Sequence, residues 1–153
     1  MINEMTRYDS VDLARHIMAI CKEKGCDYNN TKINKLLYII YGSYLALFNK
    51  EIVTERPKYL PYGPVFINVF KQYDNLMPAK FEVSEELKAV IETVFLNFGN
   101  KTAGYLSAWS HAKNSPWDKI HQVKGEEWGE EIQVFDIMNY FKNFVSFKNG
   151  NRN

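Results

Sequence analysis

The segment from Ile33 to Phe48 reads INKLLYIIYGSYLALF, and its apolar side chains fall at nearly every position around a helix. A helix that is hydrophobic on all sides has to be surrounded by other elements, because a surface helix keeps one polar face toward water. With Asn30 or Thr31 as the capping residue, the sequence predicts a central buried helix that ends near Phe48. Gly42 lowers helix propensity there by roughly 1 kcal/mol relative to alanine, so we interpret it as the place where a second helix crosses closely.

The rest of the composition limits the chain to one globular domain. Its 153 residues fit a single domain, and a 46% hydrophobic and 15% aromatic content is enough for a sizeable core. Nineteen basic and 18 acidic residues leave a net charge of +1, which offers no overall attraction to nucleic acid or an anionic membrane. The N-terminus MINEMTRYDS lacks the apolar core of a signal peptide, and no apolar run reaches the roughly 20 residues of a membrane helix. We therefore expect a cytoplasmic protein, without a membrane or nucleic acid among its partners.

Apolar spacing and capping residues predict the remaining elements. The fold class we expect is mainly α: a compact single domain around the central helix, with at most one short strand pair before Tyr62. Ser115-Pro116-Trp117 is interpreted as a turn, and 124–131 as a polar loop. The domain is expected to span 9–147, with 1–8 and 148–153 as tails. The further predicted helices run from Asp9 or Ser10 to a stop at Gly25, from Pro64 through Tyr73, from Ser84 to Gly99, from Lys101 or Thr102 to His111, and from Asp136 to Phe147.

Three groups of residues stand out along the chain: Lys35, Leu36, Leu37 and Tyr38; Tyr62, Gly63, Pro64 and Val65; and Thr102, Leu106, Ser107, His111, Pro116 and Trp117. Together they resemble the Panacea domain. This family is found among phage-associated proteins and as the antitoxin half of bacterial toxin–antitoxin pairs. The resemblance covers roughly Asp9 to Val145, although Leu60-Pro61 replaces the usual tryptophan-containing lead and Ser110 stands where threonine is more common. It implies a protein that neutralises a cognate toxin, commonly encoded beside it, by direct contact and without a reaction of its own.

Ser107 and His111 are the residues in these groups that most resemble a catalytic pair. On a helix their side chains share a face, so a serine nucleophile beside a histidine base can be drawn. No acidic residue sits at an orienting position and the G-x-S-x-G turn is absent, so the sequence does not predict an enzyme. We expect His111 to hydrogen-bond to a backbone group or to the turn at Ser115. His111 and His121 lack metal spacing and Cys21 is interpreted as a core residue, so neither a metal nor a cofactor is expected.

Two stretches are candidates for contact with a partner. Tyr62 lies in a Gly-Pro turn that serves either as an architectural corner, which we favour, or as a binding turn. Trp128 stands among glutamates, including Glu126 and Glu127, that are either simply solvated or face a basic toxin surface. The function predicted from the sequence is therefore that of an antitoxin. The alternatives are a phage-associated adaptor or regulator that docks a partner protein and, less favoured, a small Ser/His hydrolase.

Overall fold

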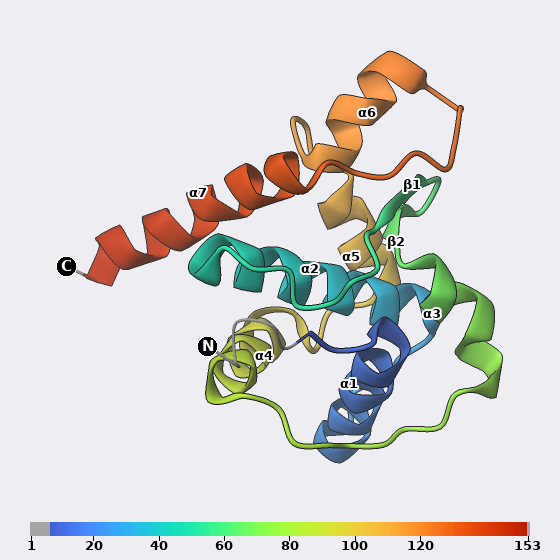
Figure 1. Cartoon of the computed structure of the whole chain (residues 1–153), viewed down its shortest axis with the longest axis vertical. Helices are drawn as coiled ribbons and strands as arrows, with labels where there is room; N and C mark the ends of the chain where they lie inside the picture. The colour runs from blue at the N-terminus through green and yellow to red at the C-terminus, as the bar shows by residue number, and fades with distance from the viewer. Residues whose placement is uncertain (1–6, 153) are drawn as a thin grey trace.

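The computed structural model describes the backbone of residues 7–152 and the side chains of residues 7–144 (Figure 1). The expected fold class is confirmed: a single, mainly helical domain with one short strand pair. None of the helices in this described part of the chain is long and apolar enough to cross a membrane. The elements are α1 (Ser10–Lys24), α2 (Asn30–Phe48), β1 (Lys58–Leu60), β2 (Gly63–Val65), α3 (Ile67–Gln72), the 3-10 helix η2 (Tyr73–Asn75), α4 (Glu85–Phe98), α5 (Ala103–Ser110), α6 (Pro116–Lys124) and α7 (Val134–Arg152).

Helix α2 is the central element, as its sequence predicts. Every residue from Lys32 to Gly42 is buried, and α1, α4, α5 and α7 all pack against the helix (Figure 1). It begins slightly earlier than expected, because the Asn29 side chain accepts the Lys32 N–H and acts as the N-cap. The interpretation of Gly42 is confirmed: a Cβ at this position would overlap the ring of Phe141, so α7 crosses α2 at the glycine.

The caps predicted for three other helices are confirmed. Asp9, Ser84 and Thr102 each accept a backbone N–H from the first turn of α1, α4 and α5, respectively. Gly25 ends α1 in the left-handed conformation with a φ of 71°, a region that glycine enters at little cost. Local capping chemistry therefore sets the ends of these helices.

The prediction that a helix begins at Pro64 is wrong. Gly63 and Pro64 instead lie in β2, which pairs antiparallel with β1 so that Lys58 faces Val65, and α3 begins only at Ile67. The single strand pair is thus confirmed, but it flanks Tyr62 on both sides and does not precede it. Gly63 has a φ of 110°, which a right-handed helix does not allow, and this keeps the chain extended before α3.

Helices α6 and α7 also differ from prediction. The supposed turn at Ser115 is the start of helix α6, with Ser115 as N-cap and Pro116 in the first turn. Helix α7 starts at Val134 and continues to Arg152, beyond both predicted ends. His16 of α1 is only 4% exposed, and its Nδ1 accepts the Phe81 N–H at 3.2 Å. Burial lowers the pKa of His16, with the nearby charge of Lys80 acting in the same direction.

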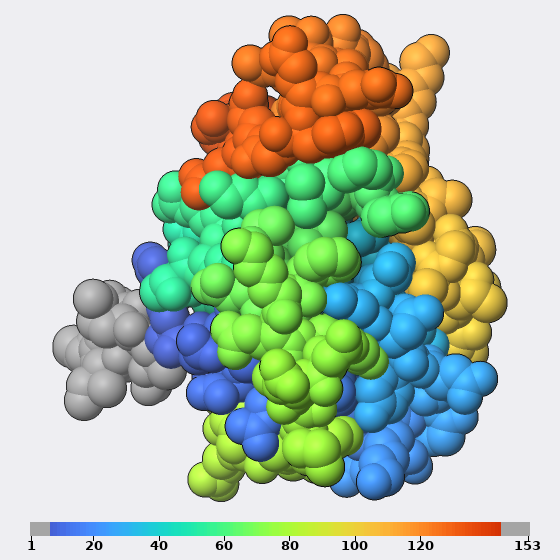
Figure 2. Space-filling view, turned by 90° about the vertical axis from the view of Figure 1, so that its right-hand side faces the viewer, coloured from blue at the N-terminus to red at the C-terminus, as the bar shows by residue number. Residues whose placement is uncertain are grey.

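The segment from 129 to 132 is an extended strip along β1. The Gly129 N–H donates to the Tyr59 carbonyl at 2.7 Å, and the Tyr59 N–H donates to the Glu130 carbonyl at 2.7 Å. The Ile132 N–H donates to the Pro57 carbonyl at 3.0 Å. Strand β1 therefore lies between β2 and this strip. In the space-filling view, the orange and red residues of α6 and α7 form one end of the molecule, directly above the teal and green connector and hairpin (Figure 2).

Candidate functional site

Three helices hold the β1–β2 hairpin by its backbone carbonyls. Trp117 Nε1 of α6 donates to the Leu60 carbonyl at 2.7 Å. Ser107 Oγ of α5 donates to the Tyr62 carbonyl at 2.8 Å, and Lys35 Nζ of α2 donates to the Pro64 carbonyl at 3.0 Å. We call these three donors the hairpin clamp. They satisfy alternate carbonyls from separate helices, so the hairpin is fixed relative to the domain core.

Lys35 is the most unusual member of the hairpin clamp. Its side chain is 1% exposed, and burial lowers its pKa to about 7 because a charged ammonium is poorly solvated inside the protein. The adjacent Gly63 leaves room for it: a Cβ on this glycine would lie 2.8 Å from Lys35 Cε and would overlap Ser110 Oγ. The glycine therefore allows the hairpin backbone to approach both side chains closely.

His111 stacks on Trp117 and does not form a catalytic pair with Ser107. The two rings lie 3.9 Å apart between centroids with 24° between their planes. Burial and the charge of Lys35 lower the pKa of His111, while a backbone hydrogen bond with Pro61 acts in the opposite direction. The Ser107 hydroxyl donates to the Tyr62 carbonyl, and His111 Nε2 is buried without a hydrogen-bond partner in the described structure. This geometry fits a structural role better than nucleophilic catalysis.

The tip of the hairpin presents Tyr62 to solvent. Its side chain is 66% exposed, while Gly63, Pro64 and Val65 behind it are buried. The exposed tyrosine is thus carried by a backbone that has little freedom to move. A large aromatic side chain held in this way loses little conformational entropy when a partner covers it.

A row of stacked rings leads from the core to Trp128. Trp117 and His121 stack at 4.7 Å, and Tyr59 lies 4.9 Å from the Trp128 ring. The Tyr59 hydroxyl lies 2.7 Å from His121 Nδ1 and also donates to the Gly125 carbonyl. Trp128 is 39% exposed, so one face of its ring packs on the row and the rest meets solvent. From the sequence, His121 stands out only as a possible metal ligand, and its place in this row of rings is not predicted.

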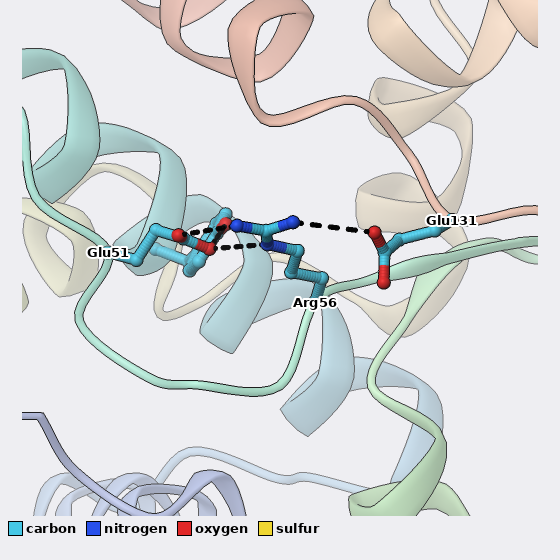
Figure 3. A network of polar contacts seen from close by, with 4 residues as sticks. Glu51, Arg56 and Glu131 are labelled. Carbon is cyan, nitrogen blue, oxygen red and sulfur yellow. Dashed lines mark hydrogen bonds and ion pairs between the residues drawn. The ribbon is translucent and has the colours of Figure 1, made fainter.

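The glutamates near Trp128 separate into two kinds. Glu131 pairs with Arg56 at 3.6 Å, and Arg56 also makes two hydrogen bonds to Glu51, at 2.9 and 3.0 Å (Figure 3). Glu130 pairs with Lys124 at 3.4 Å. Glu130 and Glu131 are therefore each neutralised by a basic side chain. Glu126 and Glu127 are exposed and form no ion pair within the described residues. These two charges are therefore available to a partner.

Within the described part of the chain, no three His, Cys, Asp or Glu side chains are grouped so that they could hold a metal ion.

Comparison with known proteins gives the family. The sequence pattern of the "Antitoxin SocA-like, Panacea domain" family matches residues 33–118, more than half of the chain. The chain belongs to this family. It is also similar to Antitoxin SocA of Caulobacter vibrioides (strain NA1000 / CB15N), with 28% identity in an alignment that covers 71% of this chain and 68% of that protein. No solved structure gives a significant match.

Most residues that identify the Panacea domain lie in its interior. Thr102 caps α5, Pro116 opens α6, and Val65 ends β2. Tyr62 and Thr102 are the exceptions, because both are exposed. The role of Asn34 is not predicted from the sequence: its side-chain oxygen accepts the Phe66 N–H at 2.7 Å, where β2 leads into α3. The remaining signature residues are buried, half-buried or part of the hairpin clamp: Leu36, Leu37, Tyr38, Gly63, Pro64, Leu106, His111, Lys35, Ser107 and Trp117.

Proposed function

We propose that this chain is an antitoxin that binds a toxin protein, encoded beside it, and neutralises it by direct contact in the cytoplasm. The proposal takes its starting point from membership of the SocA-like Panacea family and from the similarity to Antitoxin SocA. The observation that supports it best is the rigid hairpin with the exposed Tyr62 at its tip. Neither a cofactor nor a reaction is part of the proposal, since the Ser107 hydroxyl is committed to a backbone carbonyl.

We propose further that Tyr62, Glu126, Glu127 and Trp128 form one recognition face for the toxin. Trp128 packs on Tyr59, and the three residue-to-residue steps from Tyr59 to Tyr62 span at most about 11 Å of extended chain. Two exposed aromatic side chains at this spacing, each on a fixed base, resemble the central residues that carry most of the binding energy in protein interfaces. The exposed carboxylates beside Trp128 favour a toxin surface that contains lysine or arginine.

Co-expression with the neighbouring gene tests both statements. The wild-type chain should restore growth to cells that express the toxin, and the two proteins should purify together. The double variant Tyr62→Ala and Trp128→Ala should weaken the toxin complex at least about 30-fold, the effect of losing roughly 2 kcal/mol. Leu96→Ala is the matched control, because Leu96 on α4 is 87% exposed and should change affinity less than about twofold.

The outcomes separate the alternatives. If the toxic neighbour is inactivated with no detectable complex, or if no neighbour is toxic, the proposal is wrong. If the chain binds the neighbour but the neighbour's cellular level falls only when a host protease is active, the chain acts as an adaptor and not as a simple inhibitor. If the double variant binds as tightly as wild type, the recognition face lies elsewhere on the domain.

A further inference from the structure

A groove lies where the C-terminal end of α2 meets the chain before α1 and the start of α4. Its volume is about 660 Å³, within the range of roughly 300–1,000 Å³ that is typical of ligand and peptide sites. Its lining combines aromatic and aliphatic side chains with charged ones. The residues that line it are Tyr8, Tyr44, Phe48, Ile52 and Val83, together with Lys50, Glu82, Ser84, Glu85 and Glu86.

Hydrogen bonds and ring packing hold the walls of this groove in place. The Tyr8 N–H donates to the Ile52 carbonyl at 2.9 Å, and the Ser84 N–H donates to the Tyr8 hydroxyl at 3.1 Å. The rings of Tyr44 and Phe48 contact each other with centroids 4.7 Å apart. Three segments that are distant in sequence are therefore joined at the groove, and a ligand would find its shape already formed.

The charges around the groove are unbalanced. Glu82, Glu85 and Glu86 are exposed on one side, against Lys50 alone, and none of the four forms an ion pair within the described residues. The dipole of α4 accounts for acids in its first turn, at Glu85 and Glu86. It does not account for Glu82, which precedes the N-cap. Aromatic faces beside free carboxylates suit a cation on an aliphatic stem, which is the chemistry of an arginine or lysine side chain.

The groove lies at the C-terminal end of α2, and Figure 1 shows that this end of the helix points away from the β1–β2 hairpin. Lys35, which holds the hairpin, and Phe48, which lines the groove, are 13 residues apart on one helix, a rise of roughly 20 Å. A partner of ordinary domain size can reach both places. A single side chain or a short loop of a partner cannot, so the groove requires a contact of its own.

We propose that this groove is a second docking surface, which receives an exposed segment of the toxin that presents arginine or lysine beside an apolar side chain. The inference rests on the proposed antitoxin function and adds a second contact to it. The six residues before Arg7, MINEMT, include Glu4 and no lysine or arginine side chain.

The first experiment measures the affinity of the full chain for its toxin by calorimetry at low and high salt. The double variant Glu82→Lys and Glu86→Lys should weaken binding at least tenfold at low salt and should reduce the salt dependence of the affinity. Glu92→Lys is the matched control, an exposed reversal elsewhere on α4, and should change the affinity less than about threefold. Equal affinities for wild type and the double variant, with both proteins folded, would overturn the proposal.

The second experiment does not depend on the toxin, so failure of the proposed function can be told apart from failure of the groove. The amide resonances of the labelled chain are followed by NMR while a ten-residue peptide of alternating arginine and leucine is added. Shifts gathered at Tyr8, Tyr44 and Ser84, absent with a glutamate-leucine peptide, support the groove. Shifts confined to other surfaces contradict it. If deletion of residues 1–6 moves these resonances and the peptide moves none, the chain's own N-terminal segment fills the groove and the proposal is wrong.

Discussion

Replacing Lys35 by methionine tests the energetic reasoning behind the hairpin clamp. The Lys35 amine is buried, and its pKa is lowered from 10.5 to about 7, whereas the unfolded chain exposes the amine to water. Each pKa unit is worth about 1.4 kcal/mol, so below pH 7 the buried charge costs roughly 5 kcal/mol of folding free energy. Between pH 7 and 10.5 the unfolded state binds a proton that the native state does not bind, so this cost shrinks as the pH rises. Above pH 10.5 it is gone.

The methionine variant removes this cost at every pH but also removes a donor. The Pro64 carbonyl then lacks its partner, which costs roughly 1–3 kcal/mol, while the similar volume of methionine limits any loss of packing. At pH 6 we expect Lys35→Met to be more stable than wild type by roughly 2–4 kcal/mol. At pH 9 the remaining cost of the lysine charge is only about 2 kcal/mol, so the two proteins should be nearly equal.

Urea denaturation of both proteins at pH 6, 7.5 and 9 measures this difference, because titrating groups other than Lys35 and His111, whose pKa the Lys35 charge lowers, cancel between wild type and variant. The stability advantage of Lys35→Met should fall by roughly 3 kcal/mol from pH 6 to pH 9. Lys88→Met on the exposed face of α4 is the control and should show a difference that stays within about 0.5 kcal/mol over the same range. A pH-independent difference for Lys35→Met would refute the argument, since it would mean that the amine carries the same charge in both states.

Three further substitutions probe close contacts of α2 and the hairpin. Gly42→Ala should lower the free energy of unfolding by roughly 1–3 kcal/mol, because the new methyl group meets the Phe141 ring, and Phe141→Leu should restore part of it in a urea-denaturation double-mutant cycle. Gly63→Ala should cost at least as much, from its φ of 110° and from the contact with Lys35, with calorimetric melting as the measure. Ser107→Ala leaves the Tyr62 carbonyl to water and should cost about 1 kcal/mol or less in urea denaturation, since this carbonyl lies at an exposed turn.

The sequence predicts well what depends on neighbouring residues. The caps at Asp9, Ser84 and Thr102 are local hydrogen bonds, and the buried helix α2 follows from its apolar circumference. Pro64 shows the limit of this reasoning. A proline after glycine permits either a helix start or a strand, and the donor that decides between them comes from α2, 29 residues away in the chain.

The candidate site was only partly predictable for the same reason. The polar stretch near Trp128 contains the exposed glutamates that the sequence indicated, but half of its acids are neutralised by Arg56 and Lys124. The pairing of this stretch with β1 uses backbone groups, which leave no pattern in the side chains. Tyr59 and His121, which support Trp128, were likewise brought together only by the fold.

The hairpin clamp acts on backbone carbonyls, and this determines how freely the tip can vary. Trp117 and Ser107 hold the carbonyls of Leu60 and Tyr62 whatever side chains those two residues carry, so Leu60-Pro61 is accommodated in place of a tryptophan-containing lead. The tip can therefore change its partner contacts without changing the fold. Tyr62→Ser should accordingly alter the free energy of unfolding by less than about 0.5 kcal/mol and yet weaken the toxin complex at least about tenfold. Urea denaturation and calorimetric titration of the same preparation measure both quantities, and a variant that loses stability and affinity in parallel would show that Tyr62 belongs to the framework and not to the recognition face.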